Sequence, residues 1–254
     1  MTTAPILILD FDGVICDTTE ECLVAAWNAW LGYTGREGWV TAPEQLPAIA
    51  GEQLRTLRPY VRTAGEYLVL LQALEAGTAV KSQADFERCG ERFGAALAGK
   101  AERFFAARAR HRREAPRQWL ALHRVYPGIA AALPPLLARF DAYMVTGKDG
   151  ETVRILLEAS DLTFPADRIF DREAGRDKLA HVRAIARRRH CPLDQVWMVD
   201  DNVIHLLPVQ AAGAHVLLAG WGYHTPEHLA LARRERVPVV SLEEWSDRLL
   251  AAVG

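Results

Sequence analysis

The sequence predicts an α/β fold, a doubly wound parallel sheet with helices on both faces, into which an all-helical segment is inserted. Three observations favour this fold. Residues 6–9 are a run of four apolar residues, typical of a strand buried on both faces. Residues 17–124 show helical stretches and loops only. From about residue 125, helical stretches alternate with short apolar strands, as in the βα units of a parallel sheet.

The inserted segment should consist of several helices. Thr18, followed three residues later by Glu21, fits a capping box at the start of a helix over residues 19–31. Further helical stretches are expected at residues 52–76 (interrupted near Pro59 and Gly65), 82–113 and 117–124. Runs of like charge usually form a solvated face. We therefore expect such a face for the arginines of the stretch at 82–113, which include Arg108, Arg110, Arg112 and Arg113.

The second half of the chain should complete the sheet. Strands are expected at residues 140–145, 168–170, 196–199 and 215–218, with an edge strand at 237–240. Helices are expected at residues 127–137, 151–159, 176–190, 204–212, 226–234 and 242–252. We therefore predict that residues 1–16 and 125–254 form an α/β core domain and that residues 17–124 form a second, helical domain.

Composition and charge narrow the class of function. The 254-residue chain has a net charge of -2, which gives no broad attraction to nucleic acid or to an anionic membrane. Its apolar runs are too short to span a bilayer, and its first residues lack the basic and apolar regions of a signal peptide. The cysteines have neither metal-type nor disulfide-type spacing. We expect a cytoplasmic protein without a nucleic-acid or membrane partner.

Two aspartates follow the first predicted strand. Asp10 and Asp12 are one residue apart, and Gly13 allows the backbone to turn sharply after them. In open α/β sheets the ligand crevice lies at the carboxyl ends of the strands, so both side chains should lie on the floor of a site. Because side chains alternate along a strand, the two can face the crevice together only if the backbone becomes irregular there.

Polar residues also follow two of the other predicted strands. Thr146 and Gly147 come after one, Asp200 and Asp201 after another, and Lys178 lies on the connection before the latter. Four carboxylates in one crevice require either protonation or a bound cation, and Mg²⁺ prefers oxygen ligands. A carboxylate nucleophile, a metal ion, a lysine and donors for an oxyanion together indicate phosphoryl transfer.

These motifs resemble, in order and placement, the four-motif signature of the haloacid dehalogenase-like (HAD) superfamily. They are Asp10-Phe11-Asp12-Gly13-Val14, Thr146, Lys178 and Asp200-Asp201. The resemblance covers the whole chain. It points to the phosphoglycolate phosphatase and β-phosphoglucomutase-like branch, whose members have a Rossmann-like core. The inserted segment is similar to the helical cap domain of the first type.

The resemblance implies a Mg²⁺-dependent phosphatase that hydrolyses a small phosphorylated metabolite through an aspartyl-phosphate. Asp10 would be the nucleophile, and Asp12 the acid that protonates the leaving group and then the base that activates water. The implied Mg²⁺ ligands are the Asp10 carboxylate, the Asp12 carbonyl, Asp201 and, directly or through water, Asp200.

In the same family pattern, Thr146 and Gly147 would hold the phosphoryl oxygens, and Lys178 would bridge the nucleophile and the phosphate. Two residues depart from the pattern. His205 stands where many members carry another Asp, and we interpret it as a histidine on a helix face without metal contact. Cys22 replaces the cap-side His of the mutase branch, which disfavours mutase activity.

Alternatives to a phosphatase stay open at this point. They are a phosphomutase or phosphonatase on the same fold, or a catalytically idle module that binds a phosphorylated metabolite. A phosphonatase would need a Schiff-base lysine in the cap, where Lys81 and Lys100 have no evident site context. Asp12 counts against an idle module, which has no need of an acid–base group, and against C–halogen cleavage, because the true dehalogenases lack it.

Two cap arginines are candidates for substrate binding. Arg58 and Arg62 are one helical turn apart, so they share a face if their helix is unbroken. A pair of guanidinium groups suits a phosphorylated or carboxylated substrate, while a surface pair without function is the alternative. For the assembly we expect a monomer or a homodimer.

Overall fold

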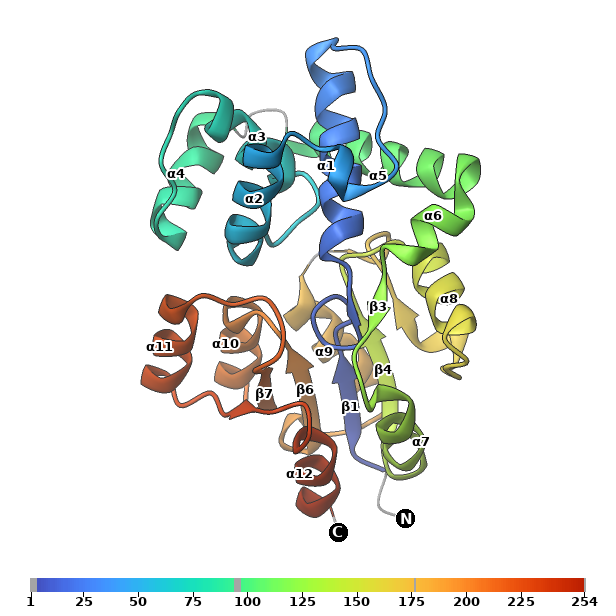
Figure 1. Ribbon diagram of the computed structural model, residues 1–254. Helices are drawn as coiled ribbons and strands as arrows, with labels where there is room; N and C mark the ends of the chain where they lie inside the picture. Colours follow the sequence, from blue (N-terminus) through green and yellow to red (C-terminus); the bar gives the residue numbers. More distant parts are fainter. Residues whose placement is uncertain (1–3, 94–96, 176, 254) are drawn as a thin grey trace. The chain divides into compact units, whose positions relative to one another are not determined.

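The structure is a computed structural model, and it describes residues 4–93, 97–175 and 177–253 (Figure 1). The chain divides into two compact units. Met1–Asp17 and Val125–Gly254 form one of them, here called the α/β unit, and Thr18–Arg124 form the other, the helical unit. Each is described by itself.

The α/β unit is built on one parallel sheet. Within the described residues the sheet has six strands in the order β5-β4-β1-β6-β7-β8. Their bounds are Ile6–Leu9 (β1), Asp141–Val145 (β4), Ile169–Phe170 (β5), Val196–Asp200 (β6), His215–Ala219 (β7) and Val239–Val240 (β8). The chain runs outward from β1 to β5 and then returns to β6, so the strand order reverses between β1 and β6. Ligands bind at such reversal points in open α/β sheets.

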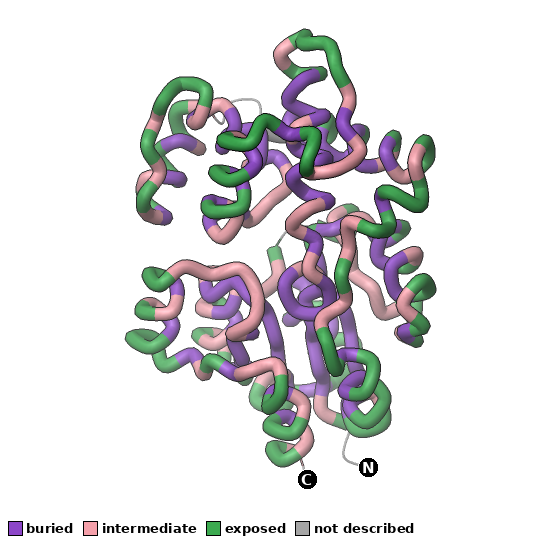
Figure 2. Tube along the Cα trace, viewed as in Figure 1, coloured by how far each residue is buried: buried purple, intermediate pink, exposed green. Residues whose placement is uncertain are grey.

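Helices cover the sheet. Their bounds are Ile129–Arg139 (α7), Gly150–Ala159 (α8), Lys178–Arg188 (α9), Val203–Ala211 (α10), Pro226–Arg234 (α11) and Trp245–Ala252 (α12), with 3₁₀ turns at Ala166–Arg168 and Leu193–Gln195. Ile6 and Ile8 of β1 pack in one apolar cluster with residues of α9, α10 and α11. Leu7 and Leu9 alternate with them and are equally buried, so β1 is covered on both faces. Figure 2 shows the central strands buried (purple) and the outer helices with exposed segments (green). The predicted fold class is confirmed.

The helical unit contains α1 (Thr19–Thr34), α2 (Ala48–Leu57), α3 (Glu66–Glu75), α4 (Gln83–Phe93), α5 (Leu97–Glu114) and α6 (Pro116–Ala121), with 3₁₀ turns at Pro43–Gln45 and Arg58–Tyr60. Its core is rich in aromatic side chains; the rings of Tyr67 and Phe104, for example, stack with centroids 5.4 Å apart. Two short strands, β2 (Cys16–Asp17) and β3 (Arg124–Val125), pair with each other where the chain passes between the units. No helix among the described residues is long and apolar enough to cross a membrane.

Two predictions about the helical unit are wrong for the same reason. Thr18 makes no side-chain cap hydrogen bond to α1, so the capping box with Glu21 does not form. Instead, the Glu21 carboxylate accepts two hydrogen bonds of 2.8 Å each from the guanidinium of Arg108 on α5. Arg108 is therefore buried rather than part of a solvated face, and its side chain is 4% exposed and that of Glu21 1%. This ion pair joins α1 to α5 inside the core.

Candidate active site

The ends of β1 and β6 bring two carboxylates together. The register pairs Leu9 with Val199, so the residues that follow, Asp10 and Asp200, lie side by side. Two neighbouring carboxylates repel each other. The positive charge of Lys178, the first residue of α9, offsets this repulsion. Its Nζ lies 2.7 Å from Oδ2 of Asp10 and 2.5 Å from Oδ2 of Asp200. The structure thus places Lys178 beside both Asp10 and Asp200.

Burial and charge act against each other in this cluster. Burial raises the pKa of Asp10, and the nearby anions of Asp200 and Asp12 raise it further, while Lys178 opposes both. Burial also favours the neutral forms of Asp200 and Lys178. Attraction between opposite charges outweighs burial: Asp10 and Asp200 raise the pKa of Lys178, and Lys178, aided by His205, lowers the pKa of Asp200. Ionising Asp10 is therefore the costly step, and a further cation beside it would offset that cost.

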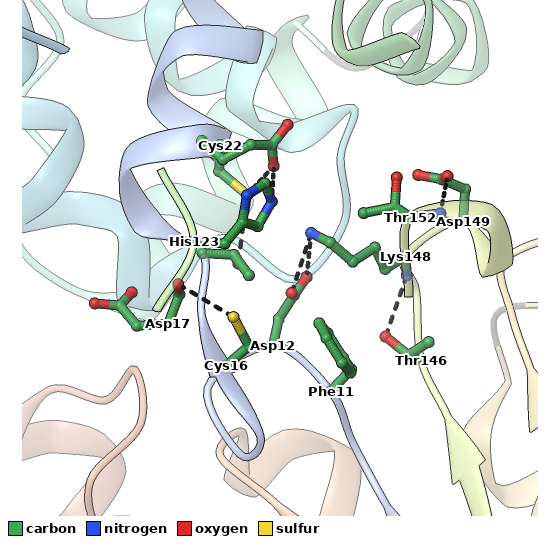
Figure 3. Close-up of polar contacts among 12 residues, drawn as sticks. Phe11, Asp12, Cys16, Asp17, Cys22, His123, Thr146, Lys148, Asp149 and Thr152 are labelled. Atoms are coloured by element: carbon green, nitrogen blue, oxygen red, sulfur yellow. Dashed lines mark hydrogen bonds and ion pairs between the residues drawn. The ribbon is translucent and has the colours of Figure 1, made fainter. Parts of the chain in front are cut away.

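Asp12 is held by a different lysine. Lys148 Nζ lies 3.1 Å from Oδ1 and 3.4 Å from Oδ2 of Asp12, as Figure 3 shows. Lys148 is 1% exposed, and its amide donates a 3.2 Å hydrogen bond to Oγ1 of Thr146 at the end of β4. The irregular backbone expected after Asp10 is present, because the Cys16 amide donates back to the Phe11 carbonyl at 3.1 Å. The two aspartates thus contact separate ammonium groups.

Glycines let Asp201 approach the loop after β1. Gly13 has a φ of +79°, and a Cβ atom there would lie 2.3 Å from Oδ2 of Asp201. A Cβ at Gly222 would lie 2.3 Å from Cβ of Asp201. The same Asp201 Oδ2 accepts a 2.8 Å hydrogen bond from the amide of Tyr223. Side chains at either glycine would push Asp201 away from the loop, so only glycine permits this arrangement.

The predicted phosphate-binding residues follow β4. Thr146 is 4% exposed, and its amide donates to the Phe170 carbonyl of β5 at 2.9 Å. Gly147 is exposed, and a Cβ there would meet no atom within 4 Å. The space beside the α-carbon of Gly147 is therefore open.

His205, interpreted from the sequence as a histidine without metal contact, lies at the edge of the carboxylate cluster. Its Nδ1 is 3.3 Å from Oδ1 of Asp200. One donor atom each of Asp10, Asp200 and His205 lies within 4.8 Å of the other two.

The donor set fits a divalent cation. Carboxylate oxygens of Asp10 and Asp200 converge, and the glycines bring Asp201 beside the loop that carries Asp12. Hard cations such as Mg²⁺ take oxygen ligands of this kind. The raised pKa of Asp10 adds a physical reason for a cation at this place.

The two candidate arginines of the helical unit are not on one helical face. The helix α2 ends at Leu57, and a 3₁₀ turn with Pro59 at its second position follows, because proline has no amide hydrogen to continue an α-helix. Arg62 pairs with Glu66 at 3.6 Å and with Glu87 at 3.3 Å. Arg58 Nη1 donates to the carbonyl of the nearby Val61 at 3.1 Å.

Sequence reasoning missed Lys148 as a site residue. The available signal was its place two residues after Thr146, at the carboxyl end of the strand that neighbours β1. Lysine side chains are rarely fully buried unless they are paired, and the partner of Lys148 is Asp12.

No protein-family model and no curated protein sequence matches this chain. Solved structures do match. A predicted phosphatase from Clostridium acetobutylicum superposes with a TM-score of 0.64 at 17% identity, over 98% of this chain and 100% of the other. A HAD-like family hydrolase from Streptococcus pneumoniae superposes with a TM-score of 0.60 at 13% identity, over 100% of both chains. The chain has the HAD-like fold.

A predicted phosphoglycolate phosphatase from Haemophilus somnus 129pt shares this HAD-like fold, with a TM-score of 0.63 and 14% identity over 98% of this chain and 99% of the other. The resemblance stated from the motifs is thereby confirmed for the fold. Within the HAD-like fold, the cluster of Asp10, Lys178 and Asp200 lies where the strand order reverses.

Proposed function

We propose that this chain is a HAD-like phosphatase that uses Mg²⁺ and hydrolyses a small phosphorylated metabolite through an aspartyl-phosphate on Asp10. The observation that carries the proposal is that Asp10 and Asp12 contact different lysine side chains. Asp10 contacts Lys178, and Asp12 contacts Lys148, so one loop presents two carboxylates in different electrostatic settings. A nucleophile and a separate acid–base group require that difference.

In the proposed first step, a carboxylate oxygen of Asp10 attacks phosphorus and the ester P–O bond breaks. Asp12 gives its proton to the departing alkoxide. In the second step, Asp12 takes a proton from water, whose oxygen attacks phosphorus and releases phosphate and the free carboxylate of Asp10. Lys178 holds Asp10 in place and neutralises charge in both steps.

The phosphoryl group also needs binding groups of its own. The hydroxyl of Thr146 and the amide of Gly147 would hold its oxygens. The metal ion would be held by Asp10, the Asp12 carbonyl, Asp200 and Asp201, and it would neutralise charge on the phosphoryl oxygens.

We propose the reducing cytoplasm as the location of the protein. The four cysteines are buried and outside disulfides, which agrees with that location.

Removal of divalent ions tests the proposal. We expect that excess EDTA abolishes hydrolysis of p-nitrophenyl phosphate and that added Mg²⁺ restores it, because the clustered carboxylates need a cation to bind a phosphate dianion. Release of p-nitrophenolate measures the rate. Full activity in excess EDTA would contradict the metal assignment.

A panel of phosphorylated metabolites, assayed for phosphate release, would then identify the substrate. No release from any of them would favour an idle binding module.

Lys148 should position Asp12 for its acid–base role. We expect Lys148→Met to lower kcat/KM for alkyl phosphates by about 10²-fold, the lower range for loss of acid–base catalysis. Aryl phosphates should lose much less, because a good leaving group needs little protonation. Lys148→Arg should restore part of the loss, since it keeps the positive charge. An equal loss for both substrate types would show that Lys148 does not act through Asp12.

The arginine proposal concerns substrate selection. Arg58→Ala and Arg62→Ala should each raise KM for the natural substrate. The binding free energy lost should be about 1.5–3 kcal/mol per substitution if a charge-assisted contact to the substrate is removed. Aryl phosphate hydrolysis should change little, because that substrate offers no second group to bind. Arg88→Ala is the matched control, since Arg88 lies in the same unit and is 67% exposed. If both substrates lose activity equally, the arginines are structural or bind the phosphate itself. If all three variants behave like the wild type, the pair is surface charge and the specificity determinants lie elsewhere in the helical unit.

A further inference from the structure

A histidine reaches the carboxylates at the end of β6 because of how α10 begins. Oδ1 of Asn202 accepts a 3.0 Å hydrogen bond from the Ile204 amide and caps the helix. The capped first turn directs His205 back toward the strand, where its Nδ1 lies 3.3 Å from Oδ1 of Asp200. A donor atom of Asp10 completes a group of three within 4.8 Å.

His205 and Lys178 do not compete for the same atoms. Lys178 contacts Oδ2 of both Asp10 and Asp200, whereas His205 lies at Oδ1 of Asp200. The side chain of His205 is 25% exposed, so an ion can reach it from solvent, while the side chain of Asp200 has no exposed area. A ring nitrogen is thus available at the accessible side of a buried carboxylate cluster.

We propose that His205 ligates the divalent ion of the proposed phosphatase through one ring nitrogen, which makes this a mixed oxygen–nitrogen site. The inference rests on the proposed function, because it concerns the same ion. Oxygen ligands suit Mg²⁺, whereas imidazole favours later ions of the first transition row, such as Co²⁺ and Ni²⁺. His205 therefore raises the affinity for Co²⁺ relative to Mg²⁺, while the carboxylates keep Mg²⁺ binding possible.

The test loads the full-length protein with Mn²⁺ and measures nitrogen hyperfine coupling by pulsed EPR. We expect an imidazole ¹⁴N signal in the wild type and its loss in His205→Asp and His205→Gln, with Mn²⁺ still bound to both variants. His215→Gln is the matched control and should keep the signal. His215 is the first residue of β7, at the opposite end of the parallel sheet from the site.

Competition between Co²⁺ and Mg²⁺, followed by calorimetry, gives a second readout that is independent of turnover. The ratio of Co²⁺ to Mg²⁺ affinity should fall in His205→Asp. An absent ¹⁴N signal in the wild type, or a signal that persists in both His205 variants, would overturn the inference. Suppose that Mn²⁺ binds to the wild type without nitrogen coupling, and that Asp201→Asn weakens this binding. In that case only the inference about His205 fails. If no ion binds to the wild type, the metal-dependent function fails with it.

Discussion

Asp10→Asn should remove turnover of every phosphomonoester, with a loss of about 10⁴-fold or more, as expected when the group that forms the covalent intermediate is deleted. The amide of asparagine has the shape of the carboxylate but cannot attack phosphorus as an anion. Hydrolysis of p-nitrophenyl phosphate measures the loss. The effect should be equal for good and poor leaving groups, because no phosphoryl transfer to residue 10 takes place in either case.

The same variant should stay folded. Burial makes the Asp10 charge costly, as its raised pKa shows, so replacing the charge by a neutral amide of equal size does not leave an uncompensated anion. Asp161→Asn is a suitable control. Asp161 is exposed in the turn after α8 and has a φ of 54°, which asparagine also adopts readily. Near wild-type turnover of Asp10→Asn, with the control unchanged, would show that Asp10 is not the nucleophile.

Arg108→Met should destabilise the helical unit by about 3–5 kcal/mol, the cost of leaving one partner of a buried ion pair without the other. Arg108 donates from both Nε and Nη2 to Glu21, and neither side chain is more than 4% exposed. Its removal would leave the Glu21 carboxylate buried without its guanidinium. Denaturant dependence of hydrogen exchange in α1 and α5 measures the change in the free energy of unfolding.

A surface arginine on the same helix supplies the control. Arg113 is 69% exposed and pairs with Glu114, so Arg113→Met should cost no more than about 1 kcal/mol. The double variant Glu21→Leu, Arg108→Met should recover much of the loss, because two apolar side chains leave no buried charge. If Arg108→Met and Arg113→Met cost the same, the buried pair does not hold α1 to α5.

Residues next to a strand end were predictable, whereas residues whose role depends on distant partners were not. Asp10 and Asp200 follow apolar runs, and parallel strands must bring such ends together. The role of Lys148 could not be predicted from the sequence. Its burial depends on where the Asp12 side chain points, and the irregular loop after β1 determines that direction. Arg108 stands in a run of arginines, and its partner Glu21 is 87 residues away, so no local pattern separates it from its exposed neighbours.

Pro59 explains why Arg58 and Arg62 do not lie on one helical face. The sequence predicts an interruption near Pro59, but the spacing of Arg58 and Arg62 still suggests a shared face. The structure shows that a 3₁₀ turn and an extended residue at Val61 rotate the two side chains away from helical spacing. Spacing arguments hold only within one unbroken helix.

The central claim is that phosphate passes through Asp10, and chemical trapping of the intermediate tests it most directly. The protein is mixed with p-nitrophenyl phosphate, quenched during the first turnover and reduced with borohydride, which converts an aspartyl-phosphate to homoserine. Peptide mass spectrometry should then find homoserine at position 10 in the wild type and an unmodified residue in Asp10→Asn. A stoichiometric burst of p-nitrophenolate without modification at position 10, or modification at another residue, would contradict the account.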